Sequence, residues 1–165
     1  MFLKVLNQFK ALQTTNMIKL FFGCCMLLLS MQSFAQNNPV KWAFSAKKNT
    51  TGVYDITLAA TVPAPWHIYS QSTPSGGPLP TKISFSQNPL VSVNGAVAEQ
   101  GKTKTIHDKN FGVDVIYFNG NVNFVQTVKL KASVKTSIHG TVEYMVCNDN
   151  KCLPPVTIPF DIILN

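Results

Sequence analysis

Residues 122–130 read VNFVQTVKL, and the fold prediction rests first on this stretch. Its apolar residues stand at every second position with one interruption: Val122, Phe124, Val128 and Leu130. A period of two is typical of a β-strand that turns one face toward a protein core. We interpret the interruption as a β-bulge within a core strand of a β-sandwich.

Similar short β-type runs recur on both sides of this stretch. The other expected strands cover residues 41–46, 52–62, 81–85, 91–98, 113–118, 138–147 and 156–163. Turn signals separate them: the Pro- and Gly-rich segment 74–78 and the dipeptides Asn94-Gly95, Asn119-Gly120 and His139-Gly140. Several short strands at roughly regular spacing, without a sustained helical period, predict an all-β fold. We expect an immunoglobulin-like antiparallel β-sandwich.

The N-terminal residues have the pattern of a secretory signal peptide. A lysine precedes the apolar run 20–29, and a small-x-small cleavage site follows at Ser33-Phe34-Ala35. We therefore expect a signal peptide over residues 1–35, with Met17 as an alternative start, and a single domain over 36–165. An uncleaved membrane anchor is the alternative, although the apolar run is short for a span.

The chain is basic, but its charge pattern does not indicate nucleic-acid binding. The net charge is +7, and all 14 basic residues are lysines scattered along the sequence. Specific recognition of bases relies heavily on bidentate arginine, so we expect no nucleic-acid partner. A domain of this length can bury roughly two-thirds of its unfolded surface, so it does not need a disulfide to fold.

Of the four cysteines, only Cys147 and Cys152 follow the predicted signal peptide. They bracket the polar loop NDNK between two expected strands. If these strands form a hairpin, the two cysteines oppose each other with Cα atoms about 4.5–5.5 Å apart, which suits a disulfide. Disulfides persist in the oxidising compartments that exported proteins reach. The spacing therefore permits a bridge.

Three interpretations of the pair stay open on spacing alone: a structural disulfide, a redox pair or part of a metal site. A bridge that closes about six residues contributes about 2 kcal/mol in the chain-entropy model, which is modest and favours redox chemistry without deciding it. Structural zinc needs four ligands, and the three histidines are scattered. Copper(I) held by Met145, Cys147 and Cys152 is conceivable.

The stretch YMVCNDNKCLPP at 144–155 resembles the active-site hairpin of the N-terminal periplasmic domain of the thiol:disulfide interchange protein DsbD. In both, an aromatic-x-x-Cys strand leads through a short polar loop to a second cysteine, which Pro-Pro follows closely. The segment HDKNFG at 107–112 resembles the cap loop of that family, and WHIYSQ at 66–71 resembles its aromatic segment. The resemblance covers about residues 40–162.

The resemblance implies an immunoglobulin-like domain that relays reducing equivalents in the periplasm, without a cofactor or metal. Cys147 and Cys152 would cycle between dithiol and disulfide. Cys152 would form mixed disulfides with partners, and Cys147 would resolve them. The implied partners are thioredoxin-like proteins or domains and a membrane electron-transfer protein, and we expect the domain to be a monomer. Its activity, if it turns over, would be that of a protein-disulfide reductase.

The resemblance also assigns a pocket to the cysteine pair. Phe111 would be a cap that shields the sulfurs until a partner displaces it. Trp66 and Tyr69 would help to build the pocket, and His107 and Asp108 belong to the cap loop. A reduced pair in an oxidising compartment needs such protection, because access governs the rate of exchange.

The chain departs from the family pattern in its cap loop and in its length. Lys109 and Asn110 stand where the family has acidic residues, and the loop between the cysteines is slightly shorter. The chain stops at Asn165, without the membrane helices and thioredoxin-like domain of full-length members, so we expect it to meet its donor as a separate protein. Two other functions are compatible with the sequence: an immunoglobulin-like binding module with a structural hairpin disulfide, and a copper(I)-handling protein.

Overall fold

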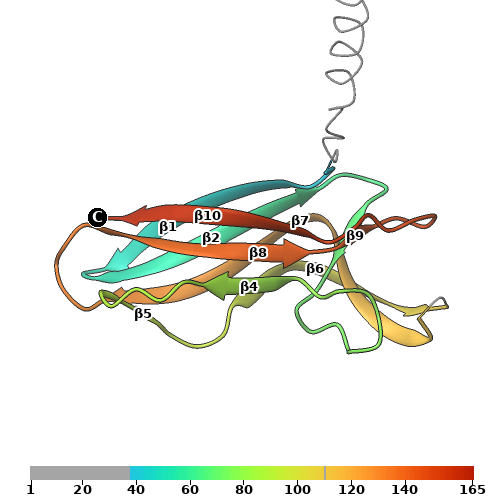
Figure 1. Cartoon of the computed structure of the whole chain (residues 1–165), viewed down its shortest axis with the longest axis horizontal. Coiled ribbons are helices and arrows are strands. Elements are labelled where there is room, and N and C mark those ends of the chain that lie inside the picture. The colour runs from blue at the N-terminus through green and yellow to red at the C-terminus, as the bar shows by residue number, and fades with distance from the viewer. Residues whose placement is uncertain (1–37, 110) are drawn as a thin grey trace, which may run out of the picture. The chain divides into compact units, whose positions relative to one another are not determined.

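Two antiparallel β-sheets pack face to face in the computed structural model, which describes residues 38–109 and 111–165 (Figure 1). Asn38–Asn165 forms one compact unit. The prediction of an all-β, immunoglobulin-like antiparallel sandwich is thereby confirmed. The predicted signal peptide over 1–35 lies outside the described residues. Among the described residues, no helix has the length and apolar character that crossing a membrane requires.

The described strands divide unequally between the two sheets. The larger sheet contains β1 (Lys41–Thr50), β2 (Val53–Val62), β3 (His67–Tyr69), β5 (Val91–Val93), β6 (Ala98–Asp108), β7 (Val113–Leu130) and β9 (Val146–Cys147). The smaller sheet contains β4 (Lys82–Phe85), β8 (Thr136–Tyr144) and β10 (Val156–Leu164), in the order β10-β8-β4. All pairings between these strands are antiparallel.

Strand β7 is the centre of the larger sheet because other strands pair with it along both edges. β2 and β3 pair with one edge, and β5 and β6 pair with the other. Alternate residues of β2 and β7 point toward the smaller sheet and form the core: Tyr54, Ile56, Leu58, Ala60, Val62, Phe118, Val122, Phe124 and Val128. Full burial of one large apolar side chain contributes about 1.5–3 kcal/mol, so this core holds the two sheets together.

Gln126 occupies the interruption in the stretch VNFVQTVKL, and its side chain is buried, with 1% exposed. Its Nε2 atom donates hydrogen bonds to the carbonyl oxygens of Asn94, at 2.7 Å, and Thr127, at 3.0 Å. The pairing of β7 with β2 is continuous from Gly120 to Lys129, so the predicted bulge at this position was wrong. A buried amide with satisfied hydrogen bonds can take the place of an apolar residue in a core strand.

Two dipeptides predicted as strand breakers, Asn119-Gly120 and His139-Gly140, lie inside β7 and β8 respectively. β7 is therefore one strand of 18 residues rather than two short ones. Gly120 has a φ of +90°, and the pairing of β6 with β7 shifts nearby, between Gly101 and Thr103. Glycine adopts positive φ at little cost, so β7 absorbs this bulge without ending.

Most of β6 was not predicted. The expected strand 91–98 is instead two elements, β5 and the start of β6, separated at Asn94-Gly95. From Ala98 to Asp108, β6 is exposed at every position except Glu99 and Asp108, which are half-buried. A strand that buries neither face shows no apolar alternation, so its sequence AEQGKTKTIHD carries no strand signal.

The chain changes sheets at Met145, within the predicted strand 138–147. β8 pairs with β4 and β10 in the smaller sheet, whereas β9 pairs with β3 in the larger sheet. Neighbouring residues of a strand point to opposite faces. Val146 packs in the core between the sheets, and Cys147 belongs to a separate buried cluster with Tyr69 and Val115. Cys147 therefore lies on the face of the larger sheet that points away from the core.

Candidate functional site

A disulfide joins Cys147 and Cys152 at the mouth of the hairpin that follows β9. The two Cα atoms are 4.0 Å apart, and the two residues form an isolated antiparallel bridge. The predicted hairpin and its disulfide are thereby confirmed. The hairpin projects from the end of the sandwich where the turn between β6 and β7 also lies (Figure 1).

The hairpin turn is closed by hydrogen bonds as well as by the disulfide. The amide of Asn148 donates to the carbonyl of Lys151, and the amide of Leu153 donates to the carbonyl of Val146, both at 2.9 Å. The side-chain oxygen of Asn148 also accepts from the amides of Asn150 and Lys151 at 2.9 Å, as in an Asx turn. The turn therefore has backbone and side-chain hydrogen bonds in addition to the disulfide.

The two cysteines differ in their access to solvent. Cys147 is buried, with 2% exposed, in a cluster with Tyr69 and Val115. Half-buried Val113, Tyr117 and Met145 pack against this cluster. Cys152 is exposed. Cys152 is therefore the cysteine of the pair that another protein can approach, whereas Cys147 is enclosed by its neighbours.

The turn between β6 and β7 forms one wall of a cleft around the disulfide. Within it, the amide of Gly112 donates to the carbonyl of Asp108 at 2.7 Å, and the amide of Phe111 donates to the Asp108 carboxylate at 3.4 Å. Gly112 has a φ of +68°, a conformation that favours glycine. Phe111 is 42% exposed, so it is not part of the core.

This cleft, with a volume of about 740 Å³, brings together most of the residues that the sequence singled out. Its lining includes Cys147, Cys152, Phe111, Tyr69, His107 and Asp108. His107 lies opposite Asp114 across the β6–β7 pairing, and its Nδ1 atom is 2.9 Å from the Asp114 carboxylate. Both of these side chains are more than 60% exposed, so this ion pair contributes little to stability.

His67 also lines this cleft, although the sequence analysis did not select it. It pairs directly with Cys147 across the β3–β9 ladder, and its Nε2 atom lies 3.2 Å from the hydroxyl of Tyr69. Burial lowers the pKa of His67, and the negative charges of Asp149 and Asp108 partly oppose this shift. Burial, with smaller contributions from Asp108 and Tyr117, raises the pKa of Tyr69 to about 12.

Trp66 lies beside the disulfide cleft rather than in it. It lines a neighbouring cleft of about 570 Å³, which shares His67 and Asp149 with the first. Its half-buried ring packs against the main core, and the Nζ atom of Lys151 lies 6.0 Å from the ring centroid. That distance suits a cation–π contact, which would hold the Lys151 side chain over Trp66.

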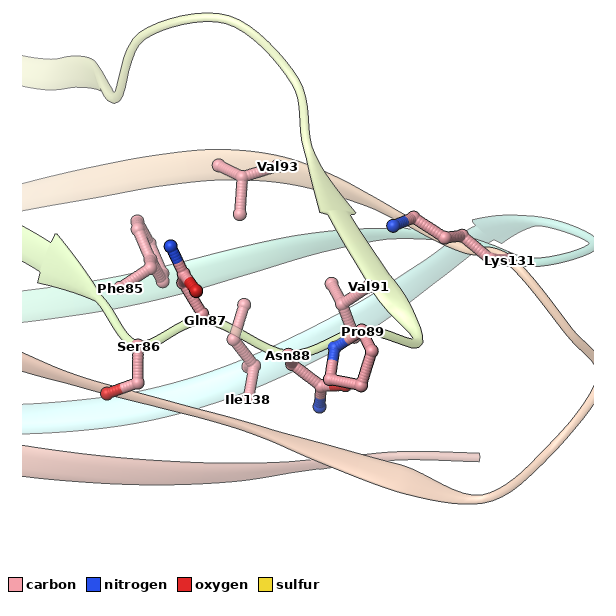
Figure 2. Close-up of a pocket in the computed structure, with 9 residues that line it drawn as sticks. All are labelled: Phe85, Ser86, Gln87, Asn88, Pro89, Val91, Val93, Lys131 and Ile138. Atoms are coloured by element: carbon pink, nitrogen blue, oxygen red, sulfur yellow. The ribbon is translucent and has the colours of Figure 1, made fainter.

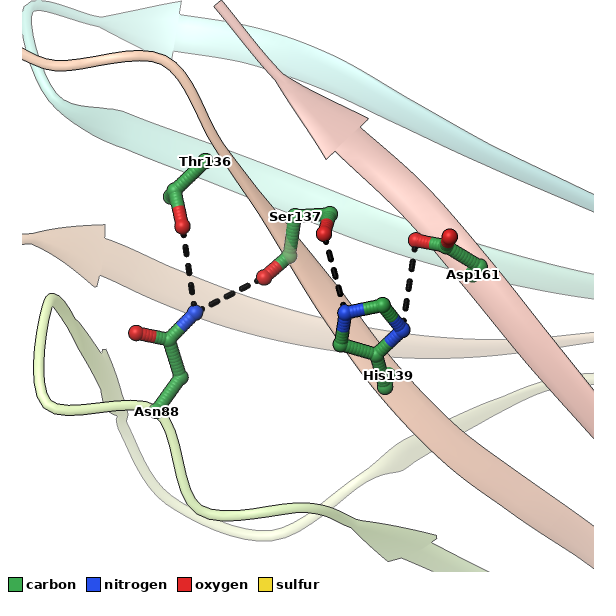
Figure 3. A network of polar contacts seen from close by, with 5 residues as sticks. All are labelled: Asn88, Thr136, Ser137, His139 and Asp161. Carbon is green, nitrogen blue, oxygen red and sulfur yellow. Dashed lines mark hydrogen bonds and ion pairs between the residues drawn. The ribbon is translucent and has the colours of Figure 1, made fainter.

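A serine, a histidine and an aspartate line up on the outer face of the smaller sheet (Figure 3). The Oγ atom of Ser137 is 2.9 Å from Nε2 of His139, and Nδ1 of His139 is 3.4 Å from the Asp161 carboxylate. This atom order is that of a hydrolase triad. The side chains of His139 and Asp161 are 55% and 61% exposed, so water surrounds them and we do not select them as a catalytic site.

Another cleft, of about 420 Å³, opens at the other end of the sandwich (Figure 2). The side chains of Phe85, Val91, Val93 and Ile138 form its apolar walls, and Lys131 supplies its charged group. This lining contains no thiol, carboxylate or imidazole. In the described part of the chain, no group of three or more His, Cys, Asp or Glu side chains is arranged to hold a metal ion. The lining of the disulfide cleft, in contrast, includes both cysteines together with imidazole and carboxylate side chains.

Comparison with known proteins identifies the family of the chain. A model of the family described as "Thiol:disulfide interchange protein DsbD, N-terminal" matches residues 32–162. No curated protein matches the sequence.

Among solved structures, the reduced N-terminal domain of DsbD from Neisseria meningitidis has a TM-score of 0.54 at 14% identity, over 77% of this chain and 86% of that chain. The N-terminal periplasmic domain of ScsB from Proteus mirabilis has a TM-score of 0.55 at 19% identity, over 80% of this chain and 48% of that chain. A structure of the complex between the DsbD and PilB N-terminal domains of N. meningitidis has a TM-score of 0.49 at 12% identity, over 79% of this chain and 87% of that chain. At these identities the first two similarities show a shared fold.

Proposed function

The chain belongs to the family of N-terminal domains of the thiol:disulfide interchange protein DsbD, and we propose that it performs thiol–disulfide exchange in the periplasm through Cys147 and Cys152. One observation carries this proposal: an exposed Cys152 is bonded to a buried Cys147 in a cleft that Phe111 also lines. The hydrogen bonds of the turn supply a second argument, because they hold the turn alongside the disulfide and so leave less for a purely structural bridge to do.

The exchange proceeds in two steps. A thiolate of a reduced partner attacks the sulfur of Cys152, the disulfide breaks, and its electron pair leaves with Cys147. A second thiol of the partner then attacks the partner's own sulfur in the mixed disulfide, which releases Cys152 as a thiolate. The partner becomes oxidised by two electrons and the domain becomes reduced. The same steps in reverse pass the electrons to an oxidised acceptor.

The partners that suit this chemistry carry two vicinal thiols, as thioredoxin-like proteins or domains do. We propose that such a protein connects the domain to a membrane electron-transfer protein. We also propose that the chain is exported by the signal peptide over 1–35 and acts as a monomer. In the reduced state Phe111 covers the cleft, and a docking partner displaces it.

Trapping the mixed disulfide tests the assigned roles. Oxidised wild-type protein is mixed with a reduced thioredoxin whose second active-site cysteine is replaced by serine. We expect a covalent complex on non-reducing gels, with peptide mapping that places the partner on Cys152, because Cys147 is 2% exposed. The Cys147→Ser variant, in which Cys152 is a free thiol, should form the same adduct with a partner whose cysteine carries a leaving group. The Cys152→Ser variant should not form this adduct.

An adduct on Cys147, or no adduct with the wild type, would contradict the proposed roles. The reduction potential separates exchange from a structural bridge. Exchange-active pairs lie at about −270 to −180 mV, and structural disulfides lie below about −300 mV. A reduction potential below about −300 mV, together with failure to trap a partner, would indicate a structural disulfide and would favour the binding-module function.

A further inference from the structure

His67 is a titratable group at the disulfide that the exchange steps above do not use. It stands directly across from Cys147 in the antiparallel pairing of β3 and β9. Directly opposed residues of an antiparallel pair project from the same face of the sheet. Tyr69, two residues along β3, projects from that face too and packs in the cluster that contains Cys147. His67 and Cys147 are therefore neighbours on one surface, and both line the disulfide cleft.

The imidazole of His67 is held in place from several sides. Its Nε2 atom lies 3.2 Å from the hydroxyl of Tyr69, and its ring centroid lies 4.6 Å from that of Tyr117. His67 as a whole is half-buried. The titratable or charged groups that line the two clefts around it come from β3, β6, β7, the turn after β6 and the cysteine hairpin: Tyr69, Lys104, His107, Asp108, Lys109, Tyr117, Cys147, Asp149, Lys151 and Cys152.

Opening the disulfide places a negative charge where water does not reach it. The electron pair of the broken bond goes to the sulfur of Cys147, which is 2% exposed. A buried anion is costly unless a cation or hydrogen-bond donor accompanies it. Lys109 and Lys151 are exposed residues of the cleft lining, with the Nζ atom of Lys151 6.0 Å from the ring centroid of Trp66, and Asp108 and Asp149 are anions. His67 is the group across from Cys147 that can become a cation near neutral pH.

We propose that His67 takes up a proton when the disulfide opens and so accompanies the Cys147 thiolate as an imidazolium. This inference rests on the proposed exchange function. The sulfur–sulfur bond breaks, the partner's sulfur bonds to Cys152, the electron pair stays on Cys147, and one proton passes from solvent to His67. When Cys147 attacks to close the disulfide again, the electron pair forms the new bond and the proton returns to solvent.

The electrostatics of the oxidised protein support this cycle. Burial lowers the pKa of His67 while the disulfide is closed, which favours the neutral imidazole. A thiolate on Cys147 adds an opposite charge beside the ring, and a nearby opposite charge stabilises the charged form of a titratable group. The pKa of His67 should therefore rise on reduction. By linkage, a cationic His67 lowers the pKa of Cys147 by the same interaction.

Nuclear magnetic resonance titration of the wild-type protein tests the inference without any substitution. The imidazole signals of His67 are followed against pH in the oxidised and in the reduced protein. We expect the pKa of His67 to be at least about one unit higher in the reduced protein, which is a tenfold change in proton affinity. An equal or lower pKa in the reduced protein would overturn the inference.

A second measurement reports the same interaction through the pKa of Cys147. In Cys152→Ser, the pKa of Cys147 is read from its thiolate absorbance, and the measurement is repeated with His67→Gln added. The addition should raise the pKa of Cys147 by at least about one unit, because the cation is lost. His139→Gln is the matched control, since His139 lies on the outer face of the smaller sheet (Figure 3), and it should leave the pKa of Cys147 unchanged.

These measurements use no exchange partner, so the inference and the proposed function can fail separately. Exchange with a thioredoxin-like partner without a shift in the pKa of His67 would overturn the role of His67 alone. A shift in the pKa of His67 in a protein that exchanges with no partner would overturn the proposed function and support the His67–Cys147 pair. An unchanged pKa of Cys147 in the His67→Gln variant would count against the inference in either case.

Discussion

At the scale of single residues, the site depends on the different surroundings of two cysteines that lie five positions apart. Cys147 belongs to a sheet strand and is buried with Tyr69 and Val115. Cys152 lies beyond the turn and is exposed. Under the proposed function this asymmetry sets the order of the exchange: the exposed sulfur would be attacked and the buried sulfur would depart.

Replacing Phe111 by alanine tests its role as a cap. The residue is 42% exposed and lines the disulfide cleft, so its covered half contributes about 1 kcal/mol of burial at most. Its loss should speed alkylation of the reduced thiols by a bulky maleimide about fivefold. Ile163→Ala is the control, since Ile163 is 57% exposed on β10, and its alkylation rate should match that of the wild type. Equal rates for Phe111→Ala and the wild type would rule out the cap.

At the scale of strands, two features position the site. The 18-residue strand β7 pairs with β3 and with β6, and so it connects the strand that carries Tyr69 to the strand that leads into the Phe111 turn. The switch from β8 to β9 at Met145 moves the chain from the smaller sheet to the larger one. That switch directs Cys147 away from the core and toward the disulfide cleft.

Replacing Gly140 of β8 by alanine tests how closely the smaller sheet is packed. A Cβ atom at this position would lie 2.3 Å from Cζ of Phe160 and 2.3 Å from the carbonyl oxygen of Ser84. Gly140→Ala should therefore destabilise the protein by about 1–3 kcal/mol in urea unfolding, since both neighbours are part of the sheet or the core. Ser137→Ala, on the outer face of the same strand, should change stability by less than about 0.5 kcal/mol. A Gly140→Ala variant as stable as the wild type would show that the residues around Gly140 shift to accommodate the added methyl group.

Strand β6 shows what determines whether an element can be predicted. Its sequence is polar on both faces because it pairs with β7 outside the core, and hydrogen bonding between backbones has no sequence signature of its own. β2, in contrast, alternates between buried and half-exposed residues along most of its length, and residues 52–62 were predicted as a strand. Periodicity reports which face of a strand is buried, so a strand without a buried face escapes it.

At the scale of the whole molecule, the two faces of the larger sheet have different tasks. The inner face forms the core with the smaller sheet, and the outer face carries the second cluster, which contains Cys147. The cluster that contains Cys147 is therefore separate from the core that stabilises the fold. The same division places two titratable groups, His67 and Tyr69, where burial shifts their pKa values in opposite directions.

The stability of the oxidised protein should depend on pH through these two groups. The pKa of His67 is lowered in the folded state, so the unfolded chain binds its proton first as the pH falls below about 6.5. Stability should therefore fall from pH 7 toward pH 5, and less steeply in His67→Gln. The pKa of Tyr69 is raised to about 12, so stability should also fall as the pH rises above about 10.

Urea unfolding at several pH values measures both the acid and the alkaline decrease in stability. His139→Gln is the control for the acid limb, because His139 is exposed and lies on the opposite sheet. If His67→Gln lost stability on acidification as steeply as the wild type, the neutral, half-buried imidazole of His67 would not be the cause. If the loss of stability at alkaline pH were unchanged in Tyr69→Phe, Tyr69 would likewise not be its cause.

The all-β sandwich and the cysteine hairpin followed from the sequence, because apolar alternation and the spacing of Cys147 and Cys152 are local properties, and the family followed from the resemblance of short local motifs. The strand switch at Met145, the pairing of His67 with Cys147, the burial of one cysteine and the position of Trp66 beside the cleft did not. Each depends on which segments meet across the larger sheet, and such contacts between distant residues leave no period in the chain. Folding brings β3, the β6–β7 turn and the hairpin to one end of the sandwich, and the disulfide cleft exists only there.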